Sequence, residues 1–161
     1  MTSDWIFRVL DRDLRCLAEQ IEAYENEEDI WKLVPGVGNS PGTLAVHVAG
    51  NIQHYIGKHL GASDYVRDRD AEFSRRDVPR SVILEELAAA RSALQAGLTE
   101  LDDGTLRGEY PEKVGAYLSV GQFMVHLAAH LGYHLGQVDY HRRMIAGQDA
   151  LSGMVSPAKL A

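Results

Sequence analysis

Cysteine is almost absent from this sequence: Cys16 is the single cysteine among 161 residues, so one chain cannot form an internal disulfide. Cys16 lies between Leu14 and Leu17, and no histidine is near it in the sequence. We expect such a thiol to pack in the core as a small apolar group rather than to act as a nucleophile. The start of the chain lacks the basic and apolar regions of a signal peptide, so a reducing cytoplasm is the expected location.

Positive charge is also scarce, with 16 Lys and Arg against 23 Asp and Glu and a net charge of -7. Binding to nucleic acid requires a positive surface, so nucleic acid is not an expected partner. Arginines do gather between residues 67 and 80, but acidic residues alternate with them, and we expect a solvated connection of mixed charge there. No apolar run is long and uninterrupted enough to cross a membrane, so no membrane partner is expected.

Several catalytic signatures are missing as well. The segments HLAAH and HLGYH lack the glutamate of the zinc-protease HExxH helix, and there is no GxSxG nucleophile elbow. The sequence also lacks a phosphate-binding glycine loop and a Cys-x-x-Cys pair. Neither histidine-rich segment contains the Glu-x-x-His pattern of di-iron bundles. A metal site in this protein is therefore expected to hold a single metal ion.

What the sequence does contain is helical periodicity, because apolar residues recur every three to four positions in four segments. We therefore predict an all-α protein, a four-helix bundle in one domain over residues 1–147, followed by a polar tail over residues 148–161. The four helices are expected to cover residues 4–24, 41–60, 81–101 and 120–146. Residues 104–118 are expected to form a long ordered loop, with an extended piece in the segment GAYLSV.

All seven histidines fall on the second and fourth expected helices. His126, His130 and His134 form an i, i+4, i+8 series whose ends are about 12 Å apart by helix rise, so only an adjacent pair can bind one ion. Periodicity leaves the choice of pair open. Gly132 and Gly136 favour the lower pair, because glycine destabilises a helix interior unless a close approach requires it.

His47 on the second helix would complete a three-nitrogen metal site with an open coordination position. Gln137, three residues after His134, could orient that ligand. His54 follows His47 by two turns and is expected either to line the same cavity or to pack at the mouth of the bundle. His59 lies near the helix end and is expected to be solvated. The alternative for all of these residues is an ordinary core histidine with its own hydrogen bonds.

The run His126-Leu-Ala-Ala-His130-Leu-Gly-Tyr-His134-Leu-Gly-Gln137, together with His47 in LAVHVAGNIQHYIG, resembles the DinB/YfiT-like metal-dependent bundles. The order of the helices is similar too, and the resemblance extends to about residue 147. It implies a four-helix bundle with an up-down-down-up path, often a homodimer. It also implies that His47, His130 and His134 bind nickel, zinc or iron.

Characterised members of that family include S-transferases that use low-molecular-weight thiols such as bacillithiol, mycothiol or glutathione-like cofactors, and some hydrolases. The resemblance therefore implies a small-molecule substrate and a thiol or water activated at the metal. Candidates for the pocket lining are Asn51, His54 and Tyr133. The alternative is a bundle that binds metal without catalysis, for example a stress-response protein.

Overall fold

The computed structural model describes residues 2–99 and 101–160. Four long helices form its body: α1 (Thr2–Glu22), α2 (Pro41–Ile52), α4 (Arg80–Leu98) and α6 (Val120–Ala146). The shorter elements are η1 (Glu27–Trp31), the π-helix η2 (Gln53–Lys58), α3 (Arg69–Ser74), α5 (Asp103–Arg107) and η3 (Pro157–Leu160). Within the described residues, β pairing is limited to one bridge between Glu109 and Ser119. The predicted all-α bundle is confirmed.

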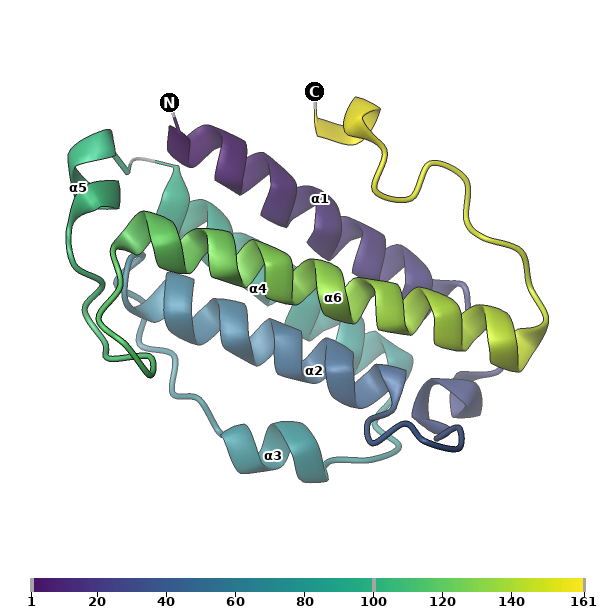
Figure 1. Ribbon diagram of the computed structural model, residues 1–161. Helices are drawn as coiled ribbons and strands as arrows, with labels where there is room; N and C mark the ends of the chain where they lie inside the picture. The colour runs from purple at the N-terminus through teal and green to yellow at the C-terminus, as the bar shows by residue number, and fades with distance from the viewer. Residues whose placement is uncertain (1, 100, 161) are drawn as a thin grey trace.

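The four long helices surround a single apolar core. α1 packs against α4 and α6, and α2 packs against the same two helices from the other side. In Figure 1, α1 and α6 run in one direction and α2 and α4 in the other, and the segment that contains α3 joins α2 to α4. Cys16 is buried in this core, as predicted. No helix in the described ranges is long and apolar enough to cross a membrane.

The sequence signals for helix ends are confirmed where side chains act as caps. The Ser40 hydroxyl accepts a hydrogen bond from the Thr43 backbone N–H, and Pro41 occupies the first position of α2. Ser119 and Gln122 form a reciprocal capping box at the start of α6. Gly147 ends α6 in the left-handed region with φ 63°, where glycine has no steric penalty. These local features fix the start of α2 and both ends of α6, the two helices that carry the histidines.

Three expectations were wrong. The second helix is not α-helical to its end, because it becomes the π-helix η2 at Gln53. The loop after α4 begins with a short helix, α5, which Asp102 caps. The charged segment around residues 67–80 is not only a solvated connection, because it contains α3, whose Glu72 is buried against α2. Short helices of this kind depend on tertiary packing, which periodicity does not reveal.

Residues after α6 lie along the bundle (Figure 1). Arg142, which is 1% exposed, donates to the Asp149 carbonyl, and the Lys159 ammonium lies 2.8 Å from the Glu19 carboxylate. These contacts attach the segment to α6 and α1. The division of the chain at residue 147 stays a prediction.

Buried His141 makes the stability of the bundle pH-dependent. Its Nε2–H donates to the Lys32 carbonyl (3.0 Å), and its Nδ1 lies 2.9 Å from the Tyr24 hydroxyl, which can donate to it when the ring is neutral. Burial lowers the pKa of His141 below the usual 6.5. His141 in the unfolded chain therefore binds a proton at about pH 6.5, whereas in the folded chain it does not. The free energy of unfolding falls as the pH drops through that value.

We expect the free energy of unfolding of the metal-free protein to decrease as the pH falls from about 7.5 to about 5.5. His141→Phe should be less stable at the higher pH but show a flatter pH dependence. Urea unfolding in a chelator at both pH values measures this difference. An unchanged slope of unfolding free energy against pH in the variant would show that His141 does not contribute to it. His130 and His134 remain in both proteins, so their contribution is the same in each.

Candidate metal centre

Three histidine rings from two helices meet on one side of the core. α2 supplies His47, which is 5% exposed, and α6 supplies His130 and His134, which are half-buried. The Nε2 atom of His130 lies 3.3 Å from Nε2 of His47 and 3.1 Å from Nε2 of His134. The structure therefore brings the lower pair of the series to His47, whereas His126 is exposed and stacks against Phe123 and His130.

The spacing of the three nitrogens fits a divalent cation. Two imidazole nitrogens at 2.0–2.1 Å from a tetrahedral metal ion are about 3.3 Å apart. When His47 and His134 carry their protons on Nδ1, the Nε2–H of His130 can point to only one of their Nε2 atoms, so without a cation the other Nε2 lone pair has no donor. A cation at the centre of the three nitrogens would remove that deficit.

The other ring nitrogens are held by acceptors that fix the tautomers. His47 donates from Nδ1 to Glu72 Oε2 (2.9 Å), and His134 donates from Nδ1 to Gln137 Oε1 (2.7 Å). Each of these rings is therefore oriented with its Nε2 lone pair towards the centre. Gln137 was predicted to orient His134, and the contact agrees with that role.

Glu72 is itself anchored by Arg67. The guanidinium donates to both carboxylate oxygens, at 2.6 Å to Oε1 and 2.8 Å to Oε2, and both side chains are less than 10% exposed. Burial alone would raise the pKa of Glu72, but the hydrogen bonds from His47 and Arg67 bring it below its usual value. The carboxylate thus stays charged and accepts from His47.

Burial favours the neutral form of the two candidate ligands on α6. Desolvation, with the charges of His134 and His47, lowers the pKa of His130 to about 4. Desolvation also lowers the pKa of His134. A histidine must be neutral to bind a metal ion, so both rings are ready to do so at neutral pH.

Several sequence expectations for the site change in the structure. A Cβ at Gly136 would have nothing within 4 Å and one at Gly132 would meet only Asp13 at 3.8 Å, so the close approach inferred from these glycines is wrong. His59 is not solvated but half-buried, 2.8 Å from Glu112. His54 also contacts Glu112, Asn51 is buried, and Tyr133 is 65% exposed with its ring 5.4 Å from that of His134.

Sequence reasoning missed Glu72 and Arg67. Both lie in a stretch where acidic and basic residues alternate, and nothing in their spacing separates them from exposed neighbours. One local signal exists, because Asp68 is a sound N-cap and Phe73 adds an apolar residue to the short helix that follows. The Phe73 ring packs against His47 with centroids 4.9 Å apart.

Gly50, one turn after His47, makes the room that Glu72 occupies. A Cβ at this position would come within 2.2 Å of Glu72 Oε1 and 3.3 Å of the Tyr65 hydroxyl. We expect Gly50→Ala to displace the carboxylate from His47 and to weaken metal binding by about 10-fold or more, although no ligand is changed. Calorimetric titration with Zn²⁺ measures the effect, and Gly136→Ala on α6, where the added methyl group has free space, is the control.

Comparison with known proteins agrees with this geometry. The model of the DinB superfamily matches residues 10–138, a range that includes all three histidines and both of the residues that anchor His47. No curated protein shows significant similarity to the chain. A family match over most of the chain, a four-helix bundle and a histidine triad compatible with metal binding lead to one conclusion: the chain belongs to the DinB superfamily.

Proposed function

We propose that His47, His130 and His134 bind one divalent cation (nickel, zinc or iron) and that the protein is a metal-dependent enzyme. Its reaction would be the transfer of a low-molecular-weight thiol to a small electrophile, with hydrolysis by water as the other reaction of this class. The observation that carries the proposal is the convergence of three Nε2 atoms, with the outer nitrogens of His47 and His134 held by Glu72 and Gln137.

A divalent cation bound there supplies positive charge that lowers the pKa of a thiol or water, so that either can lose its proton near neutral pH. Three neutral imidazoles add no negative charge of their own and leave coordination positions free. Glu72 is engaged by Arg67 and His47 at once, so its role is to hold the His47 ring rather than to take a proton from the substrate.

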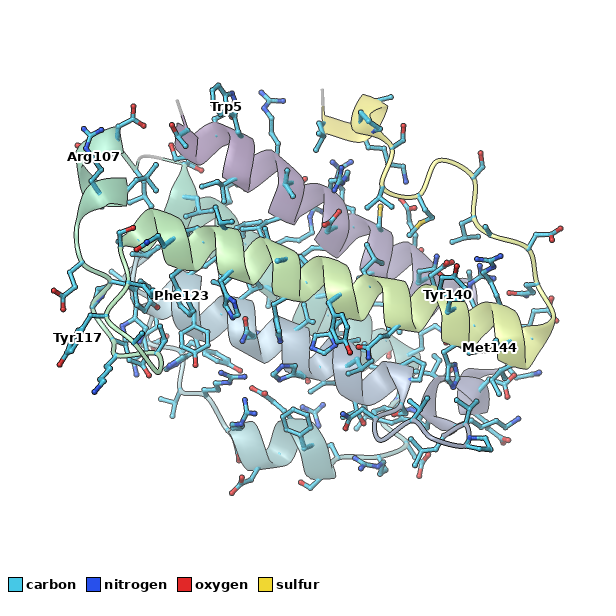
Figure 2. All side chains as sticks on the ribbon, viewed as in Figure 1. Trp5, Arg107, Tyr117, Phe123, Tyr140 and Met144 are labelled. Carbon is cyan, nitrogen blue, oxygen red and sulfur yellow. The ribbon has the colours of Figure 1, made fainter. Side chains whose placement is uncertain are left out.

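An apolar cavity of about 200 Å³ beside the triad is the candidate pocket for the electrophile. It begins one helical turn from the triad on both helices, at Leu44 on α2 and Gln137 on α6. Tyr140 and Met144, labelled near the end of α6 in Figure 2, form another part of its wall. Its other apolar lining residues are Val34, Val37 and Pro41.

This lining suits a small substrate with an apolar substituent and a reactive group near Gln137. Asn51, His54 and Tyr133 do not line this cavity, so their contact with substrate stays a prediction.

Cobalt substitution tests the proposal. The metal-free protein should bind one equivalent of Co²⁺ at the triad. The Co²⁺-loaded protein should then develop a near-ultraviolet charge-transfer band when a small thiol such as 2-mercaptoethanol is added. Ethylene glycol, the sulfur-free analogue, should produce no band. His134→Ala should bind one equivalent of cobalt fewer than the parent and lose the response to thiol while it keeps its helical circular dichroism.

The outcomes separate the functions. A thiol band supports S-transfer and justifies screening electrophiles with the metal-loaded protein. One equivalent of cobalt that never responds to thiol would contradict the transferase proposal and favour hydrolysis or a bundle that binds metal without catalysis. No cobalt binding in a folded protein would contradict the metal site itself.

A further inference from the structure

A second group of possible metal ligands lies towards the other end of α2. His54 belongs to the π-helix η2, His59 caps its C-terminal end, and Glu112 comes from the loop between α5 and α6. Glu112 Oε2 is 3.0 Å from His54 Nε2 and 2.8 Å from His59 Nε2. The two imidazole rings meet edge to face with centroids 5.0 Å apart.

The π-helix is what brings the two histidines to one side. Residues five apart in an α-helix differ by about 140° around the axis and cannot share a ligand. The hydrogen bonds of a π-helix such as η2 span five residues, and a bond of the same span follows it, from the Gly61 N–H to the Ile56 carbonyl (3.0 Å). The chain here therefore turns less per residue than an α-helix, and residues five apart come closer to one face. Such segments occur frequently at functional sites, and this one gives His54 and His59 a common face.

The hydrogen bonds of the cluster are incomplete. His59 Nε2 is close to Glu112 Oε2 but not aligned for an N–H···O bond, and it is buried with no hydrogen-bond partner among residues 2–99 and 101–160. His54 Nδ1 is also buried and has no hydrogen-bond partner among these residues. An unpaired buried nitrogen destabilises a protein, and a cation bound by His59 Nε2 would remove the deficit at that atom.

The surrounding contacts hold Glu112 in place. The Tyr110 hydroxyl donates to the Tyr55 carbonyl on η2 (2.7 Å), and the Tyr110 backbone N–H donates to the Leu118 carbonyl (2.9 Å). The Tyr110 ring also packs on Phe123, labelled in Figure 2 near the start of α6. The loop that carries Glu112 is therefore fixed against η2 and α6, so the carboxylate is positioned before any ligand arrives.

We propose that His54, His59 and Glu112 form a second binding site for a divalent transition-metal cation such as Zn²⁺. Two neutral imidazoles and one carboxylate are a ligand set that such cations prefer. The contacts to Glu112 Oε2 need to widen only to the separation of about 3.3 Å that bonds of 2.0–2.2 Å require.

The second site is separate from the histidine triad and does not depend on the function proposed for it. His47 and His54 are seven residues apart, which corresponds to about 10 Å along the helix. Metal ions that act as a pair are only about 3.5–4 Å apart. The two sites would therefore bind their cations independently.

Stoichiometry tests this proposal. Untagged, metal-free protein titrated with Zn²⁺ in a calorimeter should bind two equivalents. His47→Ala/His130→Ala should retain one equivalent, and His54→Ala/His59→Ala should retain the other. Glu112→Gln should weaken the second equivalent at least about 10-fold, whereas Glu109→Gln, which removes an exposed carboxylate from the same loop, should bind both equivalents as the parent does.

The second site would be overturned if the folded parent saturates at one equivalent of Zn²⁺ and His54→Ala/His59→Ala still binds that equivalent. This result would leave the triad unaffected. One equivalent that survives in His47→Ala/His130→Ala and disappears in His54→Ala/His59→Ala would confirm the second site even if the triad binds nothing. Circular dichroism of each variant establishes that it is folded, and Glu112→Gln, the most conservative change, provides the result if the double variant does not fold.

Discussion

His130→Ala is expected to abolish metal binding at the triad, with a loss of affinity greater than about 100-fold. His130 is the central ligand, because its Nε2 lies within 3.3 Å of the Nε2 atoms of both other histidines. Without it, His47 and His134 offer two nitrogens from different helices and no third. A cation at 100 times its Kd stabilises the parent by about 2.7 kcal/mol, and this gain should vanish in the variant.

Thermal unfolding with and without Zn²⁺ measures that gain, and calorimetric titration measures the affinity. His126→Ala is the matched control, since it removes a histidine one turn earlier on α6 that is exposed and does not belong to the triad. It should keep the parent's affinity and the parent's stabilisation at the triad. Loss of binding in both His126→Ala and His130→Ala, together with normal binding in His134→Ala, would show that the upper pair forms the site.

Glu72→Gln is expected to weaken metal binding at the triad by about 10- to 100-fold without removing a ligand. Glutamine can still accept the His47 Nδ1–H, but it lacks the charge that makes the imidazole a better donor to a cation. The change also leaves the buried guanidinium of Arg67 without its carboxylate, which costs about 3 kcal/mol of stability.

The two effects can be separated. Arg67→Gln/Glu72→Gln removes the unpaired charge, so it should recover most of the stability and none of the affinity. Asp70→Asn, an exposed change of the same kind on α3, should alter neither quantity. If Glu72→Gln binds Zn²⁺ as tightly as the parent, the contact between Glu72 and His47 is structural only.

The local features of the fold were predictable from the sequence. The caps at Ser40 and Ser119, the glycine after α6 and the apolar periodicity act over a few residues, so the start of α2 and both ends of α6 could be predicted from those residues alone. The four-residue spacing of His130 and His134 likewise places both rings on one face of a helix. These are short-range properties of the backbone, and they lead directly to the candidate ligands on α6.

Only the tertiary structure decided which residues complete each site. Helix packing brings His47 to His130 and His134 rather than to His126, and the connection from α2 to α4 folds back so that Glu72 reaches His47 through the space at Gly50. The change from α to π hydrogen bonding at η2 places His59 beside His54, where α-helical periodicity predicts another face. The physical reason is that pairwise spacing within one helix is fixed by its geometry, whereas contacts between distant segments depend on how the whole core packs.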